Sequence, residues 1–242
     1  MADKSYIGKG ILYIDGRDVG NVINLSFSIA EDKKELKTSR TTGGGNYNAL
    51  TRIDSVTLSM TMSDYSAENM AIALFGSSSA VTATTVSDES ITAPASLSGD
   101  PLVDTANVID TAETVTVTSD PAGTTYVADT DYTVTSAGIK ILSTGSISAD
   151  DALLISYTKK AVDVVEALTS SAGEYKLVLD GLNEAQSGAP FIVTVHRAKF
   201  GPAAEMSLIG DDFAELVLTG DVLQDTSITT AGLSQYFVAK AA

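Results

Sequence analysis

Few residues of this 242-residue chain are of the types that perform covalent chemistry. The chain has no cysteine, which excludes thiolate nucleophiles, disulfides and sulfur-ligated metals. Its single histidine, His196, lies inside the strand-like run FIVTVHRAK, and no partner for a Ser-His pair or a His-ligated metal can be identified beside it. We therefore interpret His196 as a strand residue and not as a general base.

Two pairs of adjacent carboxylates and one glycine-rich run are the other candidates. Neighbouring residues of a strand point to opposite faces, so Asp150 and Asp151, or Asp211 and Asp212, do not converge; a glycosidase pair or a calcium site is the weaker interpretation of them. The run TTGGG at residues 41–45 lacks the GxxxxGK spacing and does not open a helix, which argues against phosphate binding. The sequence therefore predicts no enzyme, no cofactor and no metal site.

Charge is distributed unevenly along the chain. The net charge is −16, and acids against bases number 9 to 8 over residues 1–78, 11 to 3 over 79–160 and 11 to 4 over 161–242. Proteins that bind DNA through its phosphates need clustered Lys and Arg. The acidic balance argues against DNA recognition, although it is compatible with a wall along which DNA slides.

Strands must position most of the polar side chains. Val19 to Ala30 and Ser55 to Ser63 each alternate small polar with apolar residues, which predicts two strands with one small polar face and one apolar face. The residues of the polar faces are Asn24, Ser26, Ser28, Ser55, Thr57, Ser59 and Thr61.

Residues 31–52, between these strands, are charged and then glycine-rich, which predicts a long functional or mobile loop rather than a hairpin turn. Its basic residues and glycines are Lys33, Lys34, Lys37, Arg40, Gly43, Gly44, Gly45 and Arg52. After the second strand, a helix is expected over about residues 66–75, with Ser63 or Ser66 as its N-cap and Gly76 at its end.

The composition changes at Ser77 to a stretch rich in Ser, Thr and Ala. Short strand-like runs with turn signals follow, which predicts an inserted small β-sandwich or barrel domain over residues 79–160. Further strand candidates come after it, so residues 1–78 and 161–242 are expected to form one discontinuous core domain. The predicted fold class is all-β with one short helix.

No run of about 18 apolar residues is present to span a membrane. The amino terminus lacks the apolar core of a secretion signal. We expect a soluble protein that is made and kept in a cytoplasm and does not insert into membranes.

Four stretches together resemble the major tail-tube proteins of bacteriophages with long non-contractile tails, whose relatives include contractile-phage tubes and the type VI secretion tube. They are the opening GKGILYIDGRDVGNV, the segment KTSRTTGGGNY, the helix SAENMAIALFG and the closing VHRAKFGPAAEMSLIGDDFAELVLTGDVLQD. The resemblance covers about two thirds of the chain and excludes residues 79–160. The inserted domain departs from the minimal pattern and is similar to domains that some tube proteins carry on the outside of the tail.

The resemblance implies two packed antiparallel sheets, of the sandwich or barrel type, with a flanking helix. It further implies stacked hexameric rings in the virion tail, assembled in the host cytoplasm, whose lumen holds a tape-measure protein and then conducts double-stranded DNA into the host. The expected partners are other copies of the chain, the tape-measure protein, and the tail terminator and tail-tip proteins.

Within that assembly the residues above receive expected roles. The seven small polar residues are lumen-facing candidates, because a neutral or acidic wall does not grip DNA. The loop of residues 31–52 is expected to reach the next ring and to dock against the acids Asp211, Asp212 or Asp221.

Two other protein classes remain open. The Ser/Thr/Val-rich insertion also suits a secreted or surface adhesin built of two Ig-like sandwiches, although no export signal is present. A tail-fibre or baseplate component is the third interpretation.

Overall fold

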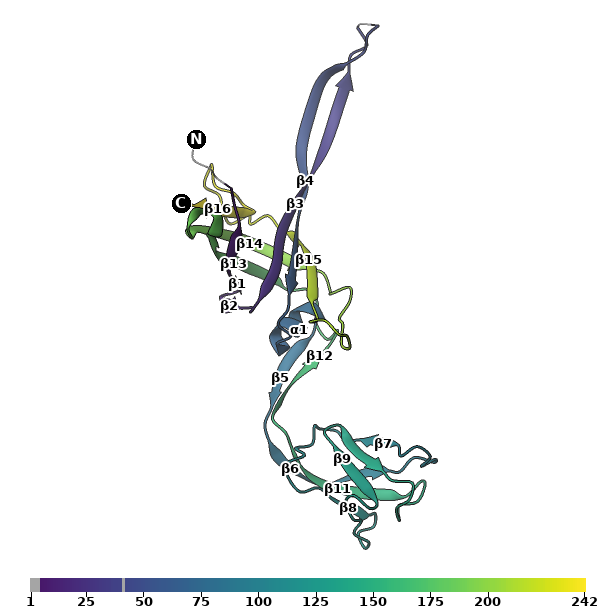
Figure 1. Ribbon diagram of the computed structural model, residues 1–242. Helices are drawn as coiled ribbons and strands as arrows, with labels where there is room; N and C mark the ends of the chain where they lie inside the picture. Colours follow the sequence, from purple (N-terminus) through teal and green to yellow (C-terminus); the bar gives the residue numbers. More distant parts are fainter. Residues whose placement is uncertain (1–4, 41) are drawn as a thin grey trace. The chain divides into compact units, whose positions relative to one another are not determined.

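The computed structural model describes residues 5–40 and 42–242 (Figure 1). The chain is mostly β-strand with one short α-helix, which confirms the predicted fold class. It divides into two compact units, one of residues 5–78 with 165–242 and one of residues 79–164. We call them the core unit and the inserted unit.

The core unit is built on one eight-stranded sheet in which all neighbouring strands are antiparallel. The strand order is β2-β1-β13-β14-β15-β4-β3, and β16 also pairs with β14. The strands are β1 (Gly8–Ile14), β2 (Arg17–Asp18), β3 (Val22–Lys37), β4 (Asn46–Met62), β13 (Glu174–Asn183), β14 (Ala189–Phe200), β15 (Leu216–Val222) and β16 (Phe237–Ala241).

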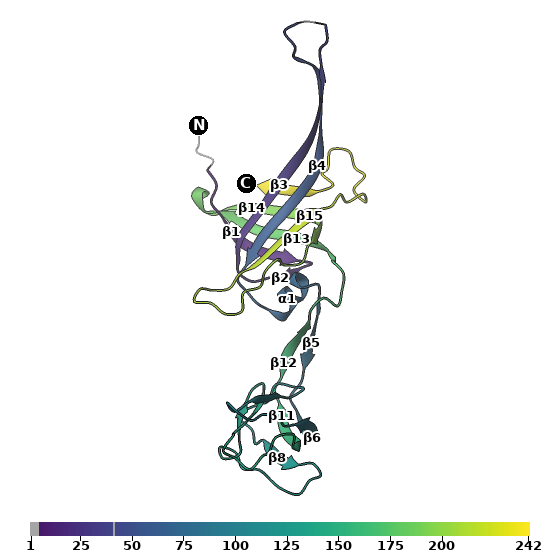
Figure 2. The same ribbon diagram turned by 90° about the vertical axis from the view of Figure 1, so that its right-hand side faces the viewer.

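The sheet divides into two arms at β14. One edge of β14 pairs with β13, and the other pairs with β16 along Phe191–Val195 and with β15 along Ala198–Phe200. From that point β15, β4 and β3 cross over the remaining strands (Figure 2), and Phe27 of β3 stacks on Phe237 of β16 with ring centroids 5.0 Å apart. The two packed antiparallel sheets are therefore the two arms of one continuous sheet.

Alternate residues of the strands form the core between these arms. Leu58 and Met60 of β4 and Leu218 of β15 are fully buried, and they lie in one cluster with Leu12 of β1 and Phe200 of β14. Because strand side chains alternate between faces, the residues between them point outward. The period of two in the sequence thus sets which face is buried.

A two-residue turn joins β1 to β2. Asp15 and Gly16 both have positive φ angles, 49° and 83°, and Ile14 pairs with Arg17 across the turn. This is the geometry of a type I′ hairpin turn, for which Asp-Gly is a favoured sequence.

The helix α1 (Ala67–Ala73) lies where a helix was expected. Ser66 is its N-cap, and its side chain accepts a hydrogen bond from the Asn69 backbone N–H at 3.2 Å. Asn69 is buried: its amide donates to the carbonyl oxygens of Val19 and Asp64 at 2.8 and 2.9 Å, and its oxygen accepts from Arg17 at 2.8 Å. These bonds attach the start of α1 to the β1–β3 region.

The prediction of a long loop over residues 31–52 is wrong. β3 and β4 continue beyond the rest of the sheet as a two-stranded ribbon, with Glu31 paired to Ile53 and Lys37 to Asn46 (Figure 1). Only residues 38–45 connect the strands, of which Thr41 lies outside the described residues. We call residues 31–54 the distal hairpin. No described residue in it is buried, so the apolar alternation that marks a half-buried strand is absent from its sequence.

The inserted unit contains two three-stranded antiparallel sheets, ordered β7-β10-β9 and β6-β11-β8. Ile139 and Ile141 of one sheet and Leu153, Ile155 and Tyr157 of the other are buried in one cluster. The unit is therefore a small sandwich. Its strands are β6 (Thr84–Thr92), β7 (Leu102–Asp104), β8 (Thr116–Ser119), β9 (Tyr132–Thr135), β10 (Gly138–Ile141) and β11 (Ala152–Lys159).

A polar network lies at the edge of this second core. The Tyr157 hydroxyl donates to Glu89 at 2.6 Å and accepts from Asn107 at 3.2 Å, while Glu89 also accepts from the Ala106 backbone N–H at 2.8 Å. Burial, followed by the bond to Glu89, raises the pKa of Tyr157. The hydroxyl thus stays a donor within the core.

The chain passes between the two units through β5 (Ser77–Val81) and β12 (Val162–Glu166), which pair as a two-stranded sheet. A single 3-10 turn, η1 (Glu184–Gln186), joins β13 to β14.

Candidate functional site

The seven small polar residues lie on one face of the β3–β4 pair. Asn24 pairs with Thr61, Ser26 with Ser59, Ser28 with Thr57, and Ala30 with Ser55. Paired residues share a face of a sheet. Because Leu58 and Met60 are buried on the opposite face, these polar side chains point outward, where they are exposed or half-buried.

β15 extends this face by three residues that the sequence reasoning did not assign to it. Val217, Thr219 and Asp221 pair with Thr61, Ser59 and Thr57, and all three are exposed. The alternation Leu216, Val217, Leu218, Thr219 was the available signal. We call the ten residues of the three strands the outer face; they are Asn24, Ser26, Ser28, Ser55, Thr57, Ser59, Thr61, Val217, Thr219 and Asp221.

Asp221 is the one charged residue of the outer face. Its partner on the other side is Lys199 of β14. Asp211 and Asp212, with which it was grouped from the sequence, lie instead in the connection between β14 and β15. The three acids are therefore not one cluster.

Most bases of the distal hairpin are strand residues paired with acids of the same strand. Glu35 accepts from Lys33 and Lys37, each at 2.7 Å, and Lys34 lies 3.7 Å from Asp32. The two lysines, and after them Asn46, lower the pKa of Glu35. These side chains are exposed, so the pairs contribute little to stability.

Two arginines of the distal hairpin differ from these lysines. Arg40 lies in the connection with Gly43, Gly44 and Gly45, and Arg52 lies on β4 opposite Asp32. Within the part of the chain that the structure describes, neither arginine has an ion-pair partner.

The segment of residues 201–215, which we call the 201–215 loop, is closed at its base. Met206 bridges to Leu216, and the Tyr65 hydroxyl donates to the carbonyl oxygen of Glu215 at 3.2 Å and lies 3.4 Å from that of Ser207. Beyond the base the loop exposes three large apolar side chains, namely Leu208, Ile209 and Phe213.

An open hollow of about 650 Å³ lies between the 201–215 loop and Val217 and Thr219 of β15. Four carboxylate residues line it, namely Glu205, Asp211, Asp212 and Glu215. The sequence reasoning identified the two aspartates but missed the apolar residues, which follow neither a helical nor a strand period.

His196 and Arg197 lie on β14 where the two arms divide. The His196 backbone N–H donates to the Tyr236 carbonyl at 3.1 Å, and its ring Nε2 is buried with no hydrogen-bond partner among the described residues. Arg197 donates from Nε and Nη2 to one Glu174 oxygen, at 3.0 and 2.7 Å, and from Nη1 to the Gln224 carbonyl at 2.9 Å.

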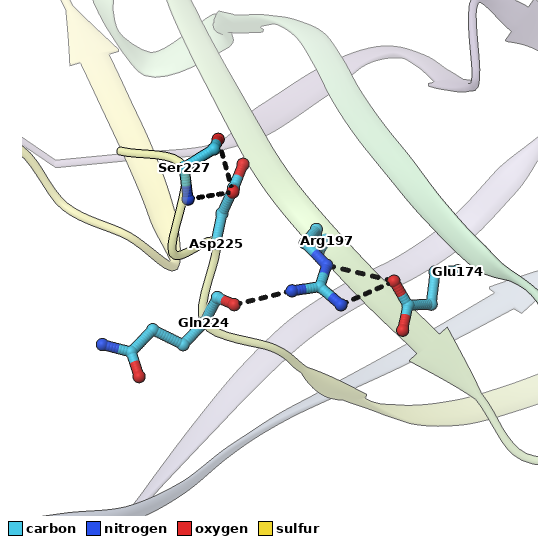
Figure 3. A network of polar contacts seen from close by, with 5 residues as sticks. All are labelled: Glu174, Arg197, Gln224, Asp225 and Ser227. Atoms are coloured by element: carbon cyan, nitrogen blue, oxygen red, sulfur yellow. Dashed lines mark hydrogen bonds and ion pairs between the residues drawn. The ribbon is translucent and has the colours of Figure 1, made fainter. Parts of the chain in front are cut away.

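Asp225, which follows Gln224 in the chain, is also held by hydrogen bonds. One of its oxygens accepts from the Ser227 backbone N–H at 3.0 Å and from the Ser227 hydroxyl at 2.7 Å, and these bonds lower the pKa of Asp225. The contacts of Arg197 with Glu174 and Gln224 thus attach the connection between β15 and β16 to β13 and β14 (Figure 3).

Among residues 5–40 and 42–242, no helix is long and apolar enough to cross a membrane. No group of three or more acidic or histidine side chains is placed to hold a metal ion in that part of the chain.

One protein-family model matches the chain, over residues 5–240, and its description is protein of unknown function UCP028589. The matched range includes both the core unit and the inserted unit. No curated protein matches the chain.

Proposed function

The chain belongs to the UCP028589 family, whose description leaves its function open, and we propose that it is a structural subunit of a bacteriophage tail tube. In this proposal the core unit assembles into hexameric rings, and the rings stack into a hollow tube in the virion tail. The proposal rests on the resemblance of the core segments to major tail-tube proteins and on the outer face of the β15-β4-β3 arm.

The outer face is the observation that carries the proposal, as the lining of the lumen. Its ten residues include no lysine or arginine and one carboxylate, Asp221, which pairs with the exposed Lys199 of β14 at the border of the face. Duplex DNA carries about one negative charge per 1.7 Å of its axis, and a basic lining would hold it by releasing counterions. A surface of small side chains, with its one carboxylate beside a lysine and no cluster of bases, lets DNA pass.

The free edge of β3 supports lateral assembly. β3 is the last strand of the sheet, and the edge that faces away from β4 has no strand partner in the described chain. An exposed edge of 16 residues is an aggregation hazard unless another strand or chain covers it. Closing neighbouring sheets into a barrel removes such edges.

The remaining partners follow from the tube. The lumen would hold a tape-measure protein before DNA ejection, and the ends of the tube would contact the tail terminator and the tail-tip proteins. Assembly would take place in the host cytoplasm. The distal hairpin is the element proposed to reach the next ring, and the inserted unit would lie on the outside of the tube.

Electron microscopy of the purified protein tests the proposal. We expect hexameric rings or tubes at high protein concentration. The inserted unit, a small sandwich joined in sequence to a second β unit, also suits a surface adhesin, and a monomer at every concentration would favour that function over the tube. Trimers would favour a tail-fibre or baseplate component.

Lysines placed on the outer face test the lumen assignment. A variant with Ser26→Lys, Ser28→Lys and Thr57→Lys is expected to form tubes that retain short duplex DNA at about 50 mM salt and release it as salt rises, because the added charges bind phosphates. Unmodified tubes are expected to retain none. Retained DNA is measured by co-sedimentation.

A matched control adds the same charge elsewhere. Ser87, Thr92 and Ser98 are exposed residues of the inserted unit. Their change to lysine is expected to leave any bound DNA open to nuclease, whereas DNA retained in the lumen is protected. Equal protection of the bound DNA from nuclease in both variants would contradict the lumen assignment.

A further inference from the structure

The 201–215 loop exposes large apolar side chains to solvent, and its base is held by contacts with other elements. Ile209 and Phe213 are each 97% exposed and Leu208 is 75% exposed. The base of the loop is closed by the Met206–Leu216 bridge and by Tyr65. Clustered exposed apolar side chains on a folded protein mark interaction surfaces, and aromatic residues are enriched in them.

The hollow beside these residues carries uncompensated negative charge. Its four carboxylate residues, at positions 205, 211, 212 and 215, have no ion-pair partner among the residues that the structure describes. A partner that fits this surface therefore has apolar side chains next to positive charge.

The end of the distal hairpin has both properties. Leu36, Tyr47 and Leu50 are exposed there. Two bases lie at this end: Lys37, which follows Leu36 and pairs with Glu35, and Arg40, which has no ion-pair partner within the described chain. This end is thus complementary to the hollow in charge and in apolar character.

The two surfaces lie at opposite ends of β4. The 201–215 loop leads into Leu216, which pairs with Met62 at the end of β4, whereas Asn46 begins β4 next to the hairpin connection. A strand of 17 residues spans about 50 Å at roughly 3.3 Å per residue. Figures 1 and 2 show the distal hairpin pointing away from α1 and the start of β15. The surfaces therefore cannot meet within one core unit.

We propose that the end of the distal hairpin of one copy docks in the hollow of the 201–215 loop of a second copy. Tyr47 packs against Phe213, and Lys37 and Arg40 face Asp211 and Asp212. The inference rests on the proposed self-assembly and names the two surfaces that form its axial contact. A contact between two different surfaces of one chain is heterologous, so it can repeat from copy to copy along a filament.

Cysteine cross-linking tests this contact directly, because the chain has no cysteine of its own. One chain carries Asn48→Cys in the distal hairpin, and a second, distinguished by a mass tag, carries Ala204→Cys in the lining of the hollow. After mild oxidation of the mixture we expect a mixed disulfide between the two chains. Each chain alone is expected to give at least tenfold less cross-linked product.

The control replaces the second chain by one with Ser87→Cys, an exposed position of the inserted unit. Tubes without the mixed disulfide would overturn the docking contact and leave the tail-tube proposal standing. A mixed disulfide without tubes would support the contact and count against the tail tube. Absence of both would overturn both.

Substitutions distinguish a specific contact from chance collision. Phe213→Ser is expected to lower the yield of mixed disulfide at least tenfold while the urea midpoint stays unchanged, because the ring is exposed. Leu168→Ser, at another strongly exposed position of the core unit, is the matched control and is expected to leave the yield unchanged. An equal effect of the two variants would contradict the docking contact.

Reversing the charges on both surfaces tests whether the bases of the distal hairpin and the acids of the hollow contact each other. Lys37→Glu with Arg40→Glu is expected to lower the cross-link yield, and Asp211→Lys with Asp212→Lys in the partner chain is expected to restore it. A loss that the reversed acids do not restore would show that the bases contact another surface.

Discussion

Replacing Leu58 with alanine is expected to lower the free energy of unfolding of the core unit by about 2–5 kcal/mol. Leu58 is 1% exposed and lies in the cluster between the two arms of the sheet. Removing its side chain loses the burial of apolar surface and leaves a cavity that close packing cannot fill. Urea unfolding followed by circular dichroism measures the change.

The neighbouring residue is a matched control. Ser59 lies next to Leu58 on β4 but belongs to the outer face, so Ser59→Ala is expected to change stability by less than about 0.5 kcal/mol. Similar losses in both variants would mean that β4 does not have one buried and one outward face. The inserted unit has its own core, and its unfolding is expected to be unchanged in either variant.

Excising the distal hairpin is expected to abolish tube formation and leave the core unit folded. Ala30 and Ser55 are cross-strand partners, so residues 31–54 can be replaced by an Asn-Gly turn between them. The excision removes no buried residue among those described, which is why little stability should be lost. It removes the proposed axial contact completely.

Sedimentation and electron microscopy measure assembly, and urea unfolding measures the fold. We expect a urea midpoint close to that of the full chain together with rings or single subunits in place of tubes. Tubes of normal length from the excised chain would contradict the role of the distal hairpin. A collapsed midpoint would show that the ribbon contributes to the fold of the core unit.

The strands that bury one face were predictable from the sequence, because burial imposes a period of two. Asn24, Ser26 and Ser28 alternate with apolar residues, and the structure places them outward as the alternation predicts. The start of the helix was predictable for a related reason, since Ser66 is its N-cap; the helix ends at Ala73, before the expected Gly76, and Phe75 takes the left-handed conformation after it.

The distal hairpin was not predictable in the same way. The charged residues at its start, such as Glu31 to Lys34, present no apolar face, because neither side of the ribbon is covered by the described residues. The backbone ladder, the hydrogen bond from Thr38 to the Gly45 carbonyl at 2.9 Å and exposed polar contacts such as that of Lys37 with Asn46 define it. Hydrophobic periodicity cannot detect a strand held in that way.

Two features of the candidate surfaces depend on how distant segments of the chain are arranged in the fold. Asp221 joins the outer face because β15 pairs with β4, and the register between strands about 160 residues apart cannot be obtained from local pattern. The exposure of Phe213 and Ile209 was likewise unreadable, since apolar residues in a loop are buried or exposed according to what the rest of the fold covers.

In the proposed assembly, the placement of the distal hairpin and the 201–215 loop at opposite ends of β4 would give a stack of copies a direction. One end of such a stack would present only free hairpins, and the other would present only free acidic hollows. The two ends would be chemically distinct, so each would need a different cap, and a cap that imitates a hairpin could not seal the end that bears hairpins. The orientation of the first layer would then determine that of every layer added to it.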